Sequence, residues 1–215
     1  MTEAIRYIME IIGTVAFAVS GALVGIGASL DIFGVCFVGT VTAVGGGILR
    51  DIFIGAVPPK ALANPTACLI AIVISVLVFV IAYIKHKKFG ELRERIEHIN
   101  NFFDAIGLAA FSVMGAEIAY VGGYEDNAFI VIILGMITGI GGGIFRDILT
   151  NTTPFVFKKH IYALAAILGS ATYYLLSEYL QNKILPSIIA MVLVIAVRLL
   201  ATKYRWSLPR IKVEN

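Results

Sequence analysis

The sequence predicts an all-α integral membrane protein with seven transmembrane helices, because of its composition, its long apolar runs and an internal repeat. Of its 215 residues, 59% are hydrophobic and 14% are charged, and the mean hydropathy is +0.92. A soluble domain of this size has too little interior to hold so much apolar surface. The apolar residues gather in runs of about 20, the length that crosses a bilayer.

Five of these runs carry no charge, and two carry isolated charged residues. The uncharged runs are 11–30, 32–49, 67–84, 127–145 and 161–177. The run 102–122 contains Asp104 and Glu117, and the run 184–201 contains Arg198. The first run lacks the short apolar core and small-residue cleavage site of a signal peptide, so we expect it to remain in the protein.

The second half of the chain repeats the first. Residues 106–116 match residues 12–22 at seven of eleven positions, and residues 135–150 match residues 39–54 at nine of sixteen. The most conspicuous match is Gly-Gly-Gly-Ile-x-Arg-Asp-Ile, which begins at Gly45 and again at Gly141. Each repeat holds three predicted helices, so the second must enter the membrane from the opposite face. The repeats are therefore predicted to be inverted.

This duplication predicts four segments. Residues 1–84 form the first three-helix repeat, and 85–101 form a polar cytoplasmic linker with a short solvated helix. Residues 102–180 form the second, inverted repeat, and 181–215 form a seventh helix with a basic cytoplasmic tail. Eleven Lys and Arg residues fall on the face that receives the linker and the tail, and three fall on the other face. The positive-inside rule therefore predicts an external N-terminus and a cytoplasmic C-terminus.

Both glycine triplets lie near the middle of a predicted helix and hence near the bilayer midplane. Glycine costs a helix about 1 kcal/mol relative to alanine. We therefore expect unwound or kinked backbone at Gly45, Gly46 and Gly47, and at Gly141, Gly142 and Gly143. Unwound backbone must be satisfied by protein or water, and its free carbonyls could replace part of the water shell of a passing cation.

A charged pair follows each triplet by about one turn: Arg50 with Asp51, and Arg146 with Asp147. Charges inside a membrane mark functional sites by default. Neighbouring residues on a helix do not face each other, so we expect each arginine to pair with another helix or to face a water-filled cavity. Arginines beside a cation pathway must either be neutralised by Asp51, Asp147 or Glu117, or act as gates.

The same features allow a purely structural interpretation, in which the triplets permit a tight helix crossing and the Arg–Asp pairs brace the bundle. The hydroxyls of Thr42 and Thr138 could line a pathway, although satisfying a helix carbonyl is their commoner role. Glu117 could be a vestibule or pore-lining charge, or an interfacial residue that snorkels to the surface. Its repeat counterpart is Leu23, so it breaks the symmetry.

Several classes of function find no support in the sequence. We find no nucleophile–base constellation, phosphate loop or metal-ligand spacing, so neither an enzyme nor a cofactor is expected. The net charge of +3 is too small to indicate nucleic-acid binding. Cys36 and Cys68 both fall within predicted helices, so no disulfide framework is expected.

The doubled Gly-Gly-Gly-Ile-x-Arg-Asp-Ile motif, with the preceding Phe-x-Val-x-Gly-Ala, resembles the trimeric intracellular cation (TRIC) channel family in its prokaryotic form. The resemblance covers about residues 7–180. It implies a homotrimer in the membrane lipids of a prokaryotic cell (inner) membrane, with a pore in each protomer. That pore would lie between the kinked second and fifth helices and conduct K⁺ and Na⁺. The glycine triplets, Arg50, Asp51, Arg146 and Asp147 would lie beside it, with the ions held only transiently at glycine carbonyls.

Two other functions remain open. The same domain has carried a glycine-transporter label, and broken helices at an inverted-repeat interface also suit a secondary transporter of a small amino acid. A structural membrane scaffold would need the glycines for assembly alone.

Overall fold

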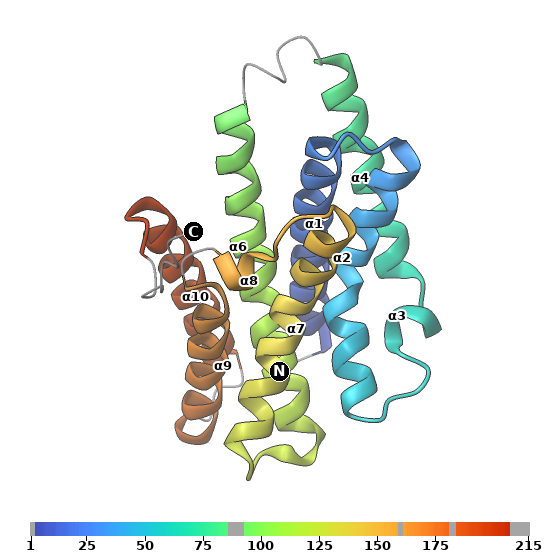
Figure 1. Ribbon diagram of the computed structural model, residues 1–215. Helices are drawn as coiled ribbons and strands as arrows, with labels where there is room; N and C mark the ends of the chain where they lie inside the picture. Colours follow the sequence, from blue (N-terminus) through green and yellow to red (C-terminus); the bar gives the residue numbers. More distant parts are fainter. Residues whose placement is uncertain (1–2, 86–92, 159–160, 181–183, 207–215) are drawn as a thin grey trace, which may run out of the picture.

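The protein is a bundle of roughly aligned helices (Figure 1). The computed structural model describes residues 3–85, 93–158, 161–180 and 184–206, and within these ranges it has no strand. Seven helices are long: α1 (Glu3–Gly27), α2 (Ile32–Phe53), α4 (Thr66–Ile84), α6 (Arg93–Ala119), α7 (Ala128–Leu149), α9 (Tyr162–Tyr179) and α10 (Leu185–Lys203). Short elements join them: α3 (Lys60–Ala63), the π-helical turn η1 (Tyr120–Tyr124) and α8 (Phe155–Lys158).

The predicted seven-helix architecture is confirmed. Six of the long helices in the described part of the chain are long and apolar enough to cross a membrane. The remaining long helix, α9, is 18 residues long and packs against α6, α7 and α10. Helix α4 is the least buried of the six, as expected for a helix that meets lipid.

The helices form two triplets of the same design. Within the first, α1, α2 and α4 pack on one another, and within the second, α6, α7 and α9 do the same. The triplets meet through α1 against α6 and α2 against α7, while α10 packs on α6 and α9 of the second triplet. Helix α2 begins with the same cap as α7: Asp31 accepts a hydrogen bond from Gly34 N at 2.7 Å, and Asn127 accepts one from Ile130 N at 3.1 Å.

The predicted linker boundary differs from the structure. Helix α6 already begins at Arg93 and runs for 27 residues, so residues 93–101 form its first turns and not a separate solvated helix. Asn100 and Asn101 are buried, and Ser20 Oγ donates a hydrogen bond to Asn100 Oδ1 at 2.7 Å. This contact satisfies two buried polar side chains and lets the polar segment continue into the buried part of α6, whereas most side chains of 95–99 remain exposed. The other linker residues, 86–92, lie outside the described ranges.

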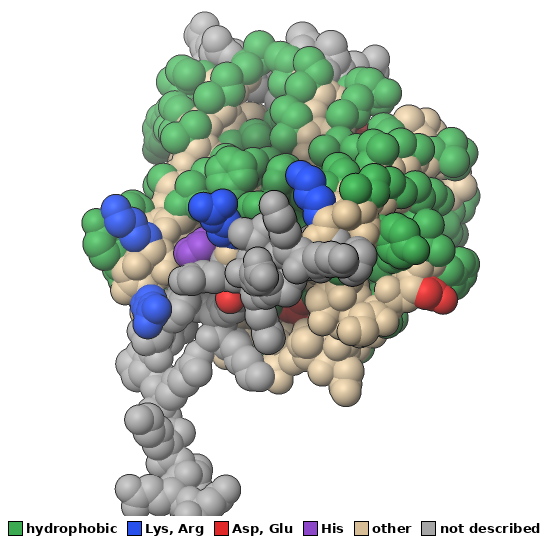
Figure 2. All heavy atoms as spheres, turned by 90° about the horizontal axis from the view of Figure 1, so that it is seen from above, with side chains coloured by type: hydrophobic (Ala, Val, Ile, Leu, Met, Phe, Trp, Pro, Cys, Tyr) green, Lys and Arg blue, Asp and Glu red, His purple; other side chains and the backbone are tan. Residues whose placement is uncertain are grey.

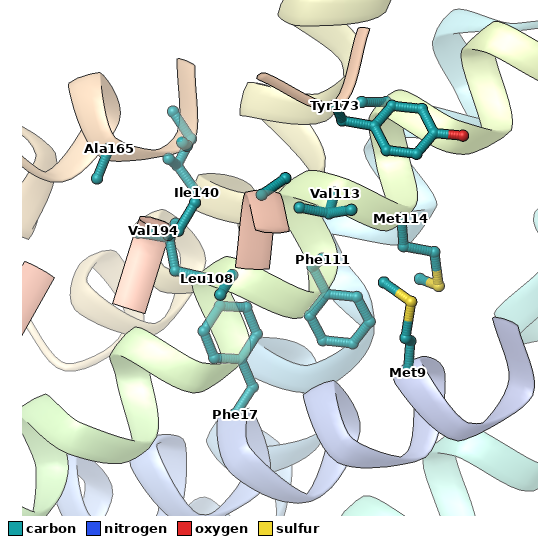
Figure 3. Close-up of a cluster of buried hydrophobic side chains, with 14 of the residues drawn as sticks. Met9, Phe17, Leu108, Phe111, Val113, Met114, Ile140, Ala165, Tyr173 and Val194 are labelled. Carbon is teal, nitrogen blue, oxygen red and sulfur yellow. The ribbon is translucent and has the colours of Figure 1, made fainter. Parts of the chain in front are cut away.

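Counterpart residues of the two repeats meet in the apolar core. Phe17 of α1 and Phe111 of α6 occupy the same repeat position, and their ring centroids are 5.3 Å apart. Met9 and Met114 lie beside this pair in Figure 3. Side chains that belong to equivalent positions can meet only near the axis that relates the repeats, so the core supports the inverted arrangement.

The surface has the distribution expected of a membrane protein. Figure 2 shows the end of the bundle that carries the start of α6, and Lys and Arg side chains gather there below broad hydrophobic flanks. Large apolar side chains such as Phe33, Tyr83 and Phe129 are more than 70% exposed, which suits contact with lipid and not with water.

Candidate functional site: the crossing of two glycine-rich helices

The candidate site is built where α2 crosses α7. Both helices remain α-helical through their glycine triplets, from Ile32 to Phe53 and from Ala128 to Leu149. The prediction of unwound backbone there is therefore wrong. The facing helix packs closely against Gly45, Gly46, Gly141 and Gly142 and keeps the backbone wound, because tertiary packing overrides the low helix propensity of glycine.

Each triplet instead lets the two backbones touch. A Cβ added at Gly46 would overlap the carbonyl oxygen of Thr138, and one added at Gly142 would overlap that of Thr42. A Cβ at Gly45 would lie 2.7 Å from Phe145 Cδ2, and one at Gly141 would lie 2.9 Å from Leu49 Cδ1. The structural interpretation of the triplets, a tight helix crossing, is thus confirmed. Small residues commonly permit such crossings in membranes.

The third glycine of each triplet has a different environment. A Cβ at Gly47 would meet nothing closer than Arg50 Nη2 at 3.7 Å, and Gly47 lines a cavity. A Cβ at Gly143 would lie 2.9 Å from the hydroxyl of Tyr162. The two repeats therefore differ at this position, with open space in the first and a filled site in the second.

The two matched threonines take the commoner of their predicted roles. Thr42 Oγ1 donates to Val38 O at 2.6 Å, and Thr138 Oγ1 donates to Leu134 O at 2.6 Å. Both are buried, and they pack against the matched glycines Gly21 and Gly115. Since each hydroxyl donates its proton to a backbone carbonyl of its own helix, neither proton is directed at a pathway.

The Arg–Asp pairs contradict the expectation that adjacent residues do not meet. Arg50 Nε and Nη2 donate to Asp51 Oδ1 at 2.9 and 2.6 Å, and Arg146 Nε donates to Asp147 Oδ1 at 2.8 Å. The arginine side chain is long enough to fold back along its own helix, a reach that the rule based on Cβ positions leaves out. Asp51 and Asp147 therefore neutralise these arginines, as one of the sequence alternatives proposed.

Each aspartate also fixes the chain that leaves its helix. Asp51 Oδ2 accepts a hydrogen bond from the backbone N–H of Lys60 at 2.8 Å, and Asp147 Oδ2 accepts one from that of Phe155 at 2.8 Å. These N–H groups belong to the first residues of α3 and α8, where a carboxylate suits the positive end of a helix. The repeated motif thus specifies the same turn in both repeats.

The second arginine lies in a wider polar cluster that the sequence analysis did not assemble. Arg146 Nη1 donates to Asp104 Oδ1 at 2.7 Å and to Ser20 Oγ at 2.6 Å. Tyr162 donates to Asp104 Oδ1 at 3.3 Å, and Arg198 Nη2 lies 3.8 Å from Asp104 Oδ2. The signal was available, because Asp104 and Arg198 are the charges that interrupt otherwise apolar runs.

Aromatic rings close this cluster. The guanidinium of Arg146 lies 4.7 Å from the ring centroid of Phe155, and that of Arg198 lies 4.6 Å from the ring centroid of Tyr162. The side chains of Arg146, Arg198 and Asp104 are at most 1% exposed. Helices α7, α9 and α10 thereby converge on one carboxylate of α6.

Glu117 lies apart from the glycine crossing. Its side chain is fully buried, and it accepts hydrogen bonds from Arg6 Nε at 2.9 Å and Arg6 Nη2 at 2.7 Å. The interpretation of Glu117 as a snorkelling interfacial residue is therefore wrong, because a buried, doubly bonded carboxylate does not reach the interface. The pair fastens α1 to α6 with the bidentate geometry of strong ion pairs.

These features define the class of protein: a multi-pass membrane protein of two inverted triple-helix repeats, crossed at paired glycines, with a seventh helix on the second repeat. A family model described as "Glycine transporter" matches residues 7–83 and 101–178, which are the two repeats. Inner membrane protein YadS of Escherichia coli is 34% identical over 213 residues, 97% of either chain. Membrane protein YvgT of Bacillus subtilis is 40% identical over 207 residues, 94% of either chain. Both carry the designation UPF0126.

Solved structures agree with these relatives. A prokaryotic TRIC channel crystallised in 0.5 M KCl is 36% identical, with a TM-score of 0.85, and the match covers 96% of this chain and all of that one. The TRIC orthologue from Rhodobacter sphaeroides is 29% identical, with a TM-score of 0.84 over 94% of this chain and all of that one. The chain belongs to the family matched by that model and these relatives: it is a prokaryotic member of the TRIC channel family. The similar solved structures are of channels and not of enzymes.

Proposed function

We propose that the protein is a monovalent cation channel that conducts K⁺ and Na⁺ as a homotrimer in a prokaryotic inner membrane, with one pathway in each protomer. The TRIC channels of similar structure support conduction of cations and the trimer. The orientation that places the N-terminus outside rests on the Lys and Arg distribution.

The observation that carries the proposal is the charge balance at the α2–α7 crossing. The sequence left open what neutralises two arginines beside a cation pathway. Asp51 bonds to Arg50, while Asp147 and Asp104 both bond to Arg146. With these counter-charges a cation does not face an isolated positive charge on either side of the crossing.

The wound backbone revises the expected pathway. Carbonyls of the glycine triplets stay within their helices, so the proposed pathway does not rely on them as transient binding sites for K⁺ or Na⁺. The proposed path instead begins in the cavity lined by Gly47, Arg50 and Asp51. Past the crossing, towards the cytoplasmic side, the proposed path reaches Arg146 and Asp147, which are fully buried in this structure, so that site must open for an ion to pass.

Ion flux into proteoliposomes tests this function. Purified protein should carry K⁺ and Na⁺ down their gradients at rates that rise steadily with ion concentration, and no counter-substrate should be needed. Empty liposomes and liposomes with an unrelated membrane protein are the controls. Flux that saturates and requires glycine on the opposite side would reject the channel.

The alternative function is a secondary transporter of a small amino acid such as glycine. It is favoured by the description of the matching family model and by the presence of charges of both signs around the outer cavity. Its test is counterflow of labelled glycine, which a transporter should show and a passive cation channel should not.

A further inference from the structure

Counterpart carboxylates of the two repeats have different partners. In the second repeat, Asp104 of α6 accepts a hydrogen bond from Arg146 Nη1 at 2.7 Å, and both side chains are fully buried. The counterpart of Asp104 in the first repeat is Glu10 of α1. Glu10 Oε2 accepts a hydrogen bond from Lys60 Nζ at 2.7 Å, and these two side chains are 21% and 54% exposed. The first repeat thus pairs its carboxylate with an exposed ammonium instead of a buried guanidinium.

The lysine stands where the second repeat has an aromatic ring. The backbone N–H of Lys60 donates to Asp51 Oδ2 at 2.8 Å, and that of Phe155 donates to Asp147 Oδ2 at 2.8 Å. Phe155 ends in an apolar ring, whereas Lys60 ends in a charge that reaches Glu10. The backbone contact anchors Lys60, and its exposed side chain remains able to turn between Glu10 and the surrounding water.

Empty space lies beside the Glu10–Lys60 pair. Two cavities, of about 70 and 30 Å³, both have Glu10 and Lys60 in their walls. The smaller one extends to Gly47 and Asp51, where the proposed cation path begins. A water molecule needs roughly 10–15 Å³ of such volume, so each cavity has room for water and for a partly hydrated ion. The two cavities form what we call the outer mouth, and an ion on the proposed path passes the Glu10–Lys60 pair there.

The charges around the smaller cavity balance only because of Lys60. The charged residues of its wall are Glu10, Lys60, Arg50 and Asp51, and the last two bind each other. Without the ammonium of Lys60, the wall would therefore carry one uncompensated negative charge, on Glu10. A carboxylate in a confined cavity raises the local concentration of cations. The position of the Lys60 side chain thus determines how strongly the outer mouth attracts cations.

The ligand that suits Glu10 is a monovalent cation. The group that now occupies it is an ammonium, which carries a single charge. Thr14 lies in the walls of both cavities and Asn64 in the wall of the larger one, so uncharged side-chain oxygens are available nearby. Ca²⁺ takes about six to eight oxygen ligands, and Mg²⁺ demands near-ideal octahedral geometry. One carboxylate and two neutral side chains fall short of both, which favours K⁺ or Na⁺.

We propose that Glu10 is the carboxylate that recruits K⁺ or Na⁺ at the outer mouth, and that Lys60 Nζ is its built-in competitor. The ammonium occupies Glu10 while no ion is bound, and a cation replaces it when the lysine side chain turns into the surrounding water. An exposed ion pair contributes little stability, so this exchange is easy. The inference rests on the proposed channel function and deepens it, because it names the pair that sets the cation concentration at the entrance.

Single-channel conductance of the full-length protein tests this role. In about 0.1 M KCl, Lys60→Gln should raise the unitary conductance about twofold or more, because an uncompensated Glu10 attracts cations over a Debye length of about 10 Å. In about 1 M KCl, where this length falls to about 3 Å, the increase should vanish. Lys60→Arg restores the charge and should remove the increase, whereas Glu10→Gln should lower the conductance. Glu125→Gln is the matched control, because this exposed glutamate follows η1 and lines neither cavity, so the conductance should stay unchanged.

Thermal unfolding in detergent tests the same site without any conduction. KCl should raise the melting temperature of Lys60→Gln more than an equal concentration of N-methylglucamine chloride, whose cation is too large for the mouth. The Lys60→Gln/Glu10→Gln double variant should lose this difference. A K⁺-specific rise in a protein that passes no current would reject the channel and support the cation site. The absence of that rise, or a conductance increase in Lys60→Gln that persists in 1 M KCl or in the double variant, would overturn the inference.

Discussion

Replacing Gly46 or Gly142 with alanine should strongly destabilise the bundle. The new Cβ would overlap a backbone carbonyl of the facing helix, and backbone cannot turn aside as a side chain can. Extra atoms in a packed core cost about 1–3 kcal/mol, and more where the neighbour is rigid. We therefore expect a loss of about 3 kcal/mol or more in the free energy of unfolding, seen as a marked fall in melting temperature in detergent.

Gly47→Ala is the matched control for this change. It lies in the same triplet and the same helix, but its Cβ would have no neighbour within 3.4 Å. The higher helix propensity of alanine, about 1 kcal/mol, should leave the protein as stable as the original or slightly more stable. Equal destabilisation by Gly46→Ala and Gly47→Ala would mean that the crossing does not depend on close backbone contact.

Asp104→Asn should be nearly as damaging, for an electrostatic reason. Asp104 is fully buried and is the carboxylate on which Arg146 and Arg198 converge. Removing one partner of a buried ion pair leaves an uncompensated charge and costs about 3–5 kcal/mol. Thermal unfolding in detergent should show a correspondingly large fall in stability.

The repeat offers a control for this variant as well. Glu10→Gln makes the same chemical change at the counterpart position, where the partner Lys60 is half exposed. Exposed ion pairs contribute about 0–1 kcal/mol, so little stability should be lost. A similar loss in both variants would show that burial of the Asp104 cluster does not determine its contribution.

The sequence predicted the architecture because the features that determine it, long apolar runs and a duplicated motif, can be recognised along the chain. Apolar runs specify the spans, and the matched motif at Gly45 and Gly141 specifies an inverted pair of helix triplets. The central glycine of each triplet then lies against the backbone of the facing helix, Gly46 against Thr138 and Gly142 against Thr42, as the structural interpretation required. Only the start of α6 differed, because Asn100 finds a buried partner in Ser20 that composition does not reveal.

The site was less predictable, because its contacts join distant segments. Glycine propensity suggested a broken helix, yet packing of α2 on α7 keeps both helices wound. The spacing of Cβ atoms on a helix argued against an ion pair between Arg50 and Asp51. The arginine side chain is nevertheless long enough to fold back along its own helix and form that pair. The partners of Arg146 come from α1 and α6, 126 and 42 residues away in sequence. No local pattern could assign them.

The structure reveals an asymmetry between the two repeats that the motif does not show. The motif alone predicts two equivalent sites. Phe155 and Tyr162 seal one of them, whereas Lys60 and Ala67 leave the other open to a cavity. Substitutions outside the motif thus leave the Arg50 site beside a cavity and the Arg146 site closed by its own neighbouring side chains.

Single-channel recording tests the proposed function most directly. Purified protein in a planar bilayer, bathed in symmetrical KCl, should produce unitary currents that reverse at zero voltage. In a KCl gradient the reversal potential should shift towards the potassium equilibrium potential. The absence of unitary events in a preparation that exchanges labelled glycine would contradict the channel and establish a transporter in its place.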